Sequence, residues 1–165
     1  MKARDDDRTH CVIKTYDELT KDELYGLMCL RDTVFVVGQK ITAVAEVDGL
    51  DPECAHALFS VDGELVGTAR IFHERDPAVV GRVAIHTAQQ RRGLGSVLMR
   101  CVQEWLGHER AAELHAQAHL ETWYASLGWA RVGEAFEEAG IPHVTMLWGP
   151  HPALHGRRNA TLQKT

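Results

Sequence analysis

The chain has 165 residues, of which 45% are hydrophobic and 25% are charged, and its formal net charge at pH 7 is -5. These proportions are typical of one globular domain with a buried core, and they exclude a disordered, collagen-like or coiled-coil protein. The negative net charge argues against nonspecific electrostatic binding of nucleic acid or anionic lipid, so any bound anion must be held by local positive groups. We expect one domain over residues 1–150 and a tail over residues 151–165.

The sequence indicates neither a membrane anchor nor a disulfide framework. No run of about 18 apolar residues is present, and the N-terminal segment Met1–Arg8 is charged rather than apolar. We therefore expect a cytoplasmic protein. The four cysteines lie far apart without a C-x-x-C pair, so we interpret them as reduced, mostly buried thiols. They are Cys11, Cys29, Cys54 and Cys101.

The first elements in chain order are a strand, a helix and an irregular segment. His10–Tyr16 predicts a short strand. Thr20 and Glu23 form a capping-box pattern at the start of a helix, which apolar spacing extends to about Val37. Gly38–Pro52 has no period and ends in an acidic run, so we expect a loop or short helix at the border of a site.

Three antiparallel strands are predicted next. The first is His56–Val61, and Asp62 with Gly63 then predicts a tight hairpin because both turn positions tolerate positive φ. The hairpin continues into Glu64–Glu74, and Val79–His86 forms the third strand.

The second half begins with a long amphipathic helix. Apolar residues recur at helical spacing over Leu94–Leu106, which predicts a helix with one face on the sheet. Glu113–His119 alternates like a strand, and a short helix containing Tyr124 stops at Gly128 in a left-handed cap. Two strands and the turn between them close the fold: Trp129–Phe136, Glu137–Pro142 and His143–Trp148. This order predicts an α+β fold with a mixed sheet covered by helices.

The segment Gln90–Ser96, between a strand and the long helix, carries the strongest chemical signal. Its two glycines let the backbone approach a ligand, and the amides at the helix start point outward with partial positive charge. Arg91 and Arg92 add donors for a diphosphate or a ribose 3′-phosphate. The ATP-binding P-loop pattern is absent, and the dinucleotide pattern fails because its third glycine falls on Leu98. A tight turn without a ligand is the alternative interpretation.

Two motifs in register resemble the GCN5-related N-acetyltransferase (GNAT) superfamily. Gln90–Gly95 matches its acetyl-CoA signature [QR]-x-x-G-x-[GA], and Thr122–Trp129 resembles its F-Y-x-x-x-G-F segment. The resemblance implies the GNAT acyl-CoA N-acyltransferase fold. This fold has a mixed, mostly antiparallel central sheet flanked by helices, with a splayed strand pair that holds the cofactor.

A narrower similarity, over most of residues 20 to 148, is to the ElaA-like acyltransferases of bacteria. The matching stretches are Val34–Val37, Val47–Asp51, Gly81–Val83, His115–Leu120 and Glu137–His143. The chain departs from the subgroup at Gly38, which precedes Gln39 where the subgroup usually has Glu-Gln. If that glutamate shapes the acceptor pocket, the acceptor specificity of this chain differs.

The resemblance implies that acetyl-CoA is a co-substrate bound between Val83–Ile85 and Leu114–His119. The pantetheine arm would hydrogen-bond the strand backbone like an added strand, and the amides of residues 91–96 would hold the pyrophosphate. The expected cofactor-binding residues are Val83, Ala84, Ile85, Gln90, Arg91, Arg92, Gly93, Leu94, Gly95, Ser96 and Tyr124.

The resemblance also implies direct attack of an acceptor amine on the thioester. A proton donor eases the departure of the CoA thiolate, and Tyr124 fits that role, although a core tyrosine is the alternative. The acceptor ammonium must first lose a proton, which costs about 4 to 5 kcal/mol at pH 7. Candidates for the base, acting directly or through a chain of waters, are Glu138, His143, His119 and the acidic loop of Glu46, Asp48 and Asp51. The expected catalytic residues are Tyr124, Glu138 and His143.

The acceptor is expected to be a primary amine of a small molecule or a peptide. The acidic run Glu46–Asp51 would attract a cationic amine, and His119 ends a predicted strand beside the same site. The expected acceptor-binding residues are Asp48, His119, Glu138 and His143.

Other ligands and functions are weighed against this interpretation. His115 and His119 share a face but lack a third ligand, so we expect no metal. A non-catalytic CoA-binding sensor or structural subunit is one alternative. An acyl-homoserine-lactone synthase is another, although the intact Q-x-x-G-x-G loop favours free CoA thioesters over acyl-carrier protein. We expect no nucleic-acid or membrane partner, and the C-terminal edge strands would allow a homodimer.

Overall fold

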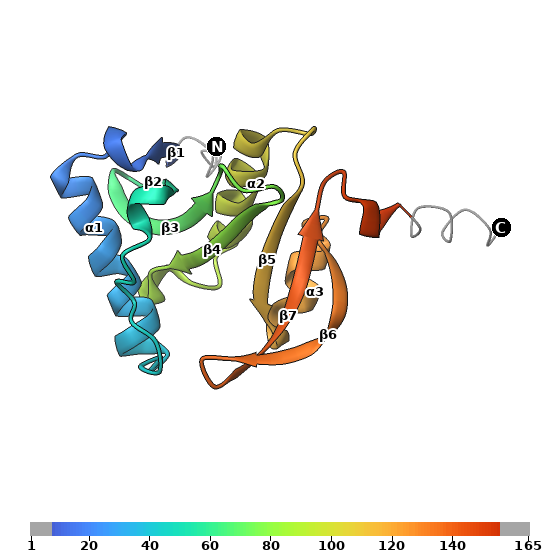
Figure 1. Ribbon diagram of the computed structural model, residues 1–165. Helices are drawn as coiled ribbons and strands as arrows, with labels where there is room; N and C mark the ends of the chain where they lie inside the picture. Colours follow the sequence, from blue (N-terminus) through green and yellow to red (C-terminus); the bar gives the residue numbers. More distant parts are fainter. Residues whose placement is uncertain (1–7, 156–165) are drawn as a thin grey trace, which may run out of the picture.

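The computed structural model describes residues 8–155, which form one sheet with helices on both faces (Figure 1). The sheet has seven strands in the order β1-β2-β3-β4-β5-β7-β6. The strands are β1 (Thr9–Thr15), β2 (Ala55–Val61), β3 (Glu64–Phe72), β4 (Ala78–Ile85), β5 (Ala112–Gln117), β6 (Ala130–Glu138) and β7 (Ile141–Trp148). The helices are α1 (Lys21–Arg31), α2 (Leu94–Leu106) and α3 (Glu121–Ser126). The pairing of β4 with β5 is parallel and the others are antiparallel, so the predicted mixed sheet is confirmed.

The main core lies between the sheet and the helices α2 and α3. Leu98 and Val102 of α2 pack with Phe59 of β2 and Leu114 of β5, all buried. This is the apolar stripe that the helical spacing predicted. On the opposite face α1 packs on β3 and β4. Because side chains alternate along a strand, Glu113 and His115, which flank Leu114, point to the side of the sheet where α1 lies.

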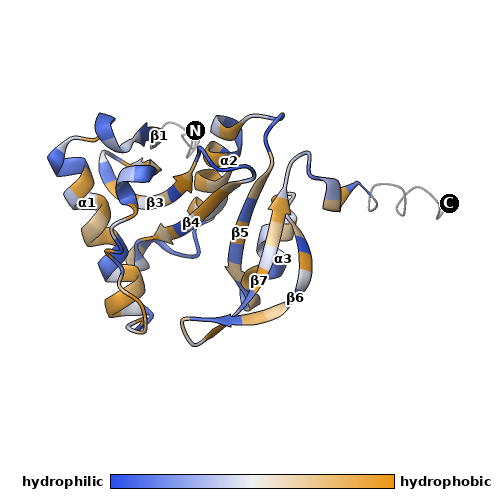
Figure 2. Ribbon diagram, viewed as in Figure 1, coloured by the Kyte–Doolittle hydropathy of each residue, from blue (hydrophilic) through white to orange (hydrophobic). Residues whose placement is uncertain are grey.

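The first helix begins with the predicted capping box and ends in a different geometry. The Glu23 amide donates to Thr20 Oγ1 at 3.1 Å, and the Thr20 amide donates to Glu23 Oε2 at 2.9 Å. After Arg31 the helix continues as a π-helix over Asp32–Gly38. The predicted extent is therefore confirmed, while the last turns are wider than an α-helix. Hydrophobic residues gather in this end of the helix (Figure 2).

The two β-hairpins test the turn predictions with opposite results. Asp62 and Gly63 join β2 and β3 with φ of 51° and 83°, as the sequence predicted. The predicted six-residue turn Glu137–Pro142 is wrong, because Ala139 and Gly140 alone separate β6 from β7, with φ of 50° and 76°. An alanine with positive φ gives no turn signal in a sequence.

Two smaller boundaries are also corrected. His119 does not end a strand, because β5 stops at Gln117 and His119 lies in a 3-10 helix over Ala118–Leu120. The left-handed residue after α3 is confirmed, since Gly128 has φ of 93°.

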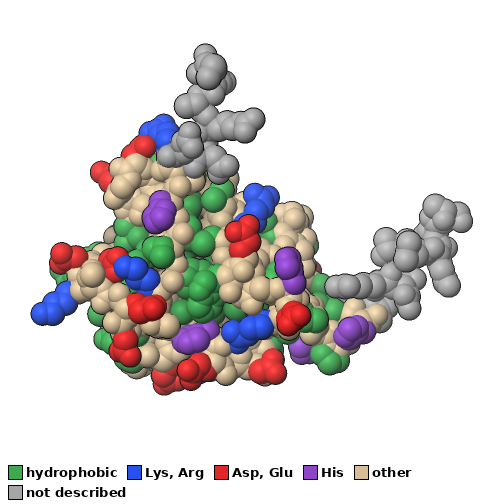
Figure 3. Space-filling model, turned by 90° about the horizontal axis from the view of Figure 1, so that it is seen from above, with side chains coloured by type: hydrophobic (Ala, Val, Ile, Leu, Met, Phe, Trp, Pro, Cys, Tyr) green, Lys and Arg blue, Asp and Glu red, His purple; other side chains and the backbone are tan. Residues whose placement is uncertain are grey.

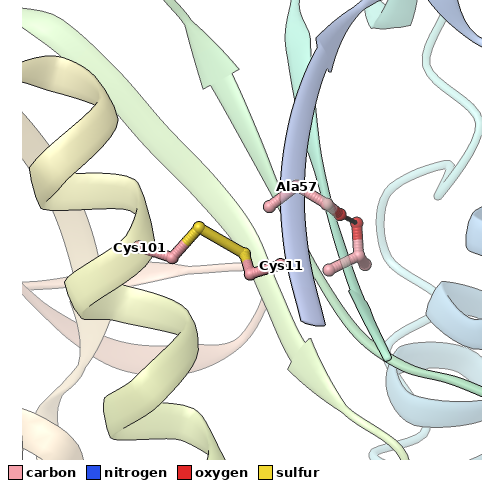
Figure 4. The surroundings of a disulfide bond; sticks show 4 residues. Cys11, Ala57 and Cys101 are labelled. Atoms are coloured by element: carbon pink, nitrogen blue, oxygen red, sulfur yellow. Dashed lines mark hydrogen bonds between the residues drawn. A yellow bond between two sulfur atoms is a disulfide. The ribbon is translucent and has the colours of Figure 1, made fainter. Parts of the chain in front are cut away.

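A disulfide joins Cys11 of β1 to Cys101 of α2 (Figure 4). The interpretation of all four cysteines as reduced thiols is therefore wrong for this pair, whose Cα atoms lie 6.6 Å apart. Of the other two, Cys29 is exposed and Cys54 is buried. The pair is separated by 90 residues in sequence, and the packing of α2 on the sheet brings it together. Disulfides are rare in the cytosol, so this bond gives no support to the predicted cytoplasmic location.

The surface carries charges of both signs. On the face drawn in Figure 3, acidic and basic side chains lie interspersed around hydrophobic ones near the middle. Among the helices of residues 8–155, none is long and apolar enough to cross a membrane.

Candidate functional site

The strands β4 and β5 pair over a short stretch and then diverge (Figure 1). Ala78–Val80 pairs with Ala112–Leu114, after which β4 stays paired with β3 and β5 stays paired with β7. Their facing backbone edges are thus left without a strand partner beyond Val80. Such an edge accepts an extended ligand through main-chain hydrogen bonds. The predicted splayed strand pair is confirmed.

A bulge in β4 lies where the two strands part. Gly81 pairs with Arg70 and Ala84 pairs with Thr68, so Arg82 and Val83 together oppose one residue of β3. Arg82 has φ of 50°, which is uncommon for a residue with a side chain. Bulges bend a strand and increase its twist, and this bend accounts for the divergence of β4 from β5.

The loop before α2 presents its backbone to solvent at the end of β4. Gln90 is exposed and its Nε2 donates to the Ile85 carbonyl at 3.0 Å, which ties the loop to the strand. Arg91 and Gly93 have φ of 63° and 76°. Among the described residues, no side chain caps the start of α2, and its first turn holds no acidic residue. The amides of this turn are therefore free to bind an anion.

The residues of this loop fit a diphosphate. Arg91 and Arg92 are exposed, so their guanidinium groups can reach a ligand, and Arg92 is held by Gln89. A Cβ on Gly93 would meet nothing within 4 Å, so open space lies beside that residue. A Cβ on Gly95 would instead lie 3.1 Å from Trp123 Cζ2, so this glycine allows α3 to pack against the start of α2.

Tyr124 lies next to that contact and is buried. Trp123 Nε1 donates to Ser96 Oγ at 3.2 Å, which fixes α3 beside the first turn of α2. The Tyr124 ring packs edge-on against Trp123 and Trp129, with centroid distances of 4.6 and 6.3 Å. Within residues 8–155 its hydroxyl forms no hydrogen bond. Burial raises the pKa of Tyr124, so the phenol keeps its proton at neutral pH.

Glu138 and His143 are brought together by the tight β6–β7 hairpin. His143 is 8% exposed, and its Nδ1 lies 2.7 Å from the Ile141 carbonyl oxygen. Because a carbonyl can only accept, Nδ1 carries the proton and the Nε2 lone pair of the neutral ring faces Glu138 Oε2 at 3.7 Å. At this distance the two groups form no hydrogen bond, but they face each other across the hairpin. The Glu138 side chain is 49% exposed, so an acceptor can reach its carboxylate.

Asp48 lies in a different environment, within a network of ion pairs. Both of its oxygens accept from Arg70 at 2.8 Å, and the hydrogen bonds from Arg70 hold the pKa of Asp48 well below its usual range. Asp51 accepts from Arg31 at 2.7 Å, and Arg82 lies 3.0 Å from a Glu46 oxygen. The charges of the acidic run are thus balanced by arginines, and the network anchors residues 46–51 beside β4.

These three arginines were not predicted as partners of the acidic run. Arg31 is 1% exposed and Arg70 is 5% exposed. The available signal was their position, since Arg70 lies within an otherwise apolar strand and Arg31 lies on the buried side of the first helix. A charge in such a place needs an opposite charge nearby.

The remaining predicted residues lie in several different surroundings. Val83 and Ile85 pack toward the main core, whereas Ala84 packs on the side of α1. His119 is exposed and takes no part in the ion pair of His143 with Glu138. Gln39 Oε1 accepts from Gln117 Nε2 at 2.9 Å, which links the end of the first helical segment to the end of β5. Among the described residues, no group of three His, Cys, Asp or Glu could hold a metal ion.

Sequence comparison identifies the family. The sequence profile of the acetyltransferase (GNAT) domain matches residues 36–149. Protein ElaA of Escherichia coli is 38% identical over 139 residues, which cover 79% of this chain and 90% of ElaA. A UPF0039 protein of Schizosaccharomyces pombe is 36% identical over 141 residues, which cover 82% of this chain and 93% of that protein.

Comparison with solved structures agrees. The crystal structure of Escherichia coli ElaA aligns with a TM-score of 0.77 and 34% identity, over 85% of this chain and 99% of that chain. An acyl-CoA N-acyltransferase from Pseudomonas aeruginosa aligns with a TM-score of 0.75 and 38% identity, over the same shares. A GNAT acetyltransferase from Elizabethkingia anophelis, solved with acetyl-CoA bound, shares the fold with a TM-score of 0.56 and 12% identity, over 87% of this chain and 99% of that chain. The chain with the splayed strands and the open loop therefore belongs to the GNAT acyltransferase family and is ElaA-like.

Proposed function

We propose that the protein is an N-acetyltransferase that moves the acetyl group of acetyl-CoA to a primary amine of a small molecule or a peptide. The observation that carries the proposal is the divergence of β4 from β5 beside the uncapped start of α2. One feature offers backbone hydrogen bonds to an extended arm, and the other offers amides to a diphosphate.

In the proposed complex, the backbone of Val83 and Ile85 binds the pantetheine arm, and the amides of residues 91–96 bind the pyrophosphate. Arg91 and Arg92 add positive charge from the exposed side of the loop. Acetyl-CoA would supply the activated acyl group. The chain supplies the position of that group and the movement of protons around it.

Tyr124 is proposed as the proton donor to the departing thiolate. Burial keeps the phenol protonated, and no described residue competes for its hydroxyl hydrogen. A group with these two properties is prepared to donate when a ligand acceptor arrives.

Glu138 and His143 are proposed to take the proton of the acceptor ammonium. Glu138 is the exposed member and meets the acceptor, while His143 faces the same carboxylate from the buried side. His119 is proposed as a further contact of the acceptor because its side chain is exposed one turn before α3. The pairing of Asp48 with Arg70 limits its contribution to shaping the loop.

A homodimer formed through the edge strand β6 is proposed as the assembly, because this strand ends the sheet. Sedimentation velocity would decide between one and two copies of the chain.

The test of the enzymatic proposal has two measurements. Isothermal titration calorimetry with CoA should give saturable binding, and a library of primary amines with acetyl-CoA should give release of CoA thiol above the rate without amine. Binding without turnover on any amine would favour a sensor. Absence of binding by folded protein would refute the assigned cofactor loop.

A further inference from the structure

His115 of β5 lies between two carboxylates on the same side of the sheet as Glu138. Its Nδ1 is 3.2 Å from Glu138 Oε1, and its Nε2 is 3.5 Å from Glu113 Oε1. The ring is 40% exposed and therefore is not a core residue. The mechanism proposed above assigns it no role.

The contact with His115 is the one that fixes the Glu138 carboxylate. Glu138 is the last residue of β6, and its side chain is 49% exposed. A glutamate in such a place rotates freely unless a partner holds it. The distance of 3.7 Å to His143 exceeds a hydrogen bond, whereas the distance of 3.2 Å to His115 falls within one.

The ring of Phe136 keeps the two imidazoles in place on either side of the carboxylate. It stacks on His143 with a centroid distance of 6.1 Å and meets His115 edge-on at 4.9 Å. Three strands therefore contribute to one cluster, with His115 from β5, His143 from β7 and Glu138 from β6.

We propose that His115 is a positioning residue that holds the Glu138 carboxylate against His143 Nε2. This inference rests on the proposed function, because it explains how Glu138 is prepared to take the acceptor proton. The N–H bond of the ammonium breaks, its electron pair stays on the nitrogen, and the proton binds the carboxylate. It can then pass to Nε2 of His143 once the carboxylate and the ring close from 3.7 Å to hydrogen-bond distance.

The charged groups around this cluster come from three strands. Glu113 and His115 face it from β5, His143 faces it from β7, and Glu138 belongs to β6. Among the described residues, no lysine or arginine forms an ion pair with these four. No cationic side chain of a lysine or arginine therefore pairs with these carboxylates in place of the histidines.

The test compares His115→Leu, His115→Asn and Glu138→Gln in two measurements. One is the pH dependence of the His143 ring signals in NMR, which needs no substrate, and the other is the pH profile of kcat/KM. His115→Leu should displace both curves in the same direction as Glu138→Gln does, and should lower kcat/KM at pH 7 about tenfold. His115→Asn keeps a donor close to the position of Nδ1 and should recover most of the loss. His10→Leu, exposed on β1 at the far edge of the sheet, is the control.

The results separate this inference from the proposed function. If the His143 signals in folded His115→Leu titrate as in the wild type, the positioning role is wrong, whatever the activity. The same holds if the asparagine variant is as impaired as the leucine variant in both measurements. If no amine yields CoA thiol with the wild type, the enzymatic proposal fails while the NMR comparison still decides the role of His115.

Discussion

The substitution Tyr124→Phe tests whether the Tyr124 hydroxyl acts in catalysis or only in the structure. The tyrosine is 5% exposed and its ring packs between two tryptophans, and these contacts persist in phenylalanine. Within residues 8–155 its hydroxyl has no hydrogen-bond partner, so its removal leaves no buried group unpaired. We expect the free energy of unfolding to change by less than about 1 kcal/mol. The rate of CoA release should instead fall by a factor of about 10² to 10⁴, the usual contribution of a general acid.

The assay for this prediction follows CoA thiol release at saturating acetyl-CoA, beside urea unfolding of the same preparation. Tyr25→Phe is the matched control, since Tyr25 is 72% exposed on α1. A Tyr124→Phe variant that is stable and fully active would refute the assignment of the hydroxyl as proton donor. A loss of stability of several kcal/mol would instead show that the hydroxyl is bonded within the fold.

The same residue predicts a pH dependence of stability. Burial raises the pKa of Tyr124 above its ordinary value of 10.0, so above about pH 10 the unfolded chain loses this proton while the folded chain keeps it. The stabilisation is present below that pH and is lost as the pH rises toward the folded-state pKa. Urea unfolding between about pH 9 and pH 11 should show a smaller decline in Tyr124→Phe than in the wild type.

Three further substitutions test the proposed cofactor loop, the ion network and the disulfide. Gly95→Ala brings a Cβ to 3.1 Å from α3, so calorimetry should show about tenfold weaker CoA binding, with Gly26→Ala as the control. Asp51→Asn leaves two buried arginines short of an anion and should cost about 3 kcal/mol in urea unfolding. Burial raises the pKa of Asp51, but the hydrogen bonds and charges of the arginines lower it by more, so the net shift is downward. The ionised Asp51 therefore stabilises the fold above about pH 4, and this stabilisation is lost as the pH falls through the folded-state pKa. The free energy of unfolding of Asp51→Asn should accordingly decline less in acid than that of the wild type. Replacement of Cys11 and Cys101 by serine removes a link between positions 90 residues apart and should lower the free energy of unfolding by about 4 to 5 kcal/mol. A reduced wild type that is as stable as the oxidised wild type would contradict this expectation.

The features that the sequence predicted well are local in the chain. The period of Leu94–Leu106 and the glycines before it determine a helix and its open N-terminus within a few turns. The Asp62-Gly63 turn is equally local, since positive φ at both positions is a property of those residues.

The features that it missed depend on contacts between distant segments. Cys11 meets Cys101 because α2 crosses the sheet, and Glu138 meets His115 from two strands away. Neither contact follows from spacing, because each needs the strand order and register. The partners of Asp48 were missed for the same reason, since Arg70 lies 22 residues further along the chain.

Arg82 links the gap between β4 and β5 with the acidic loop of residues 46–51. Its φ of 50° costs about 1 kcal/mol in a residue with a side chain, and the bulge that it forms parts β4 from β5. Its guanidinium lies 3.0 Å from Glu46 and 3.5 Å from Asp48, and these partly buried ion pairs offset the cost. The bend that opens the sheet and the contacts that hold the acidic loop over it are therefore coupled. We expect a change that relaxes Arg82 to narrow the gap between β4 and β5 and to loosen the loop together.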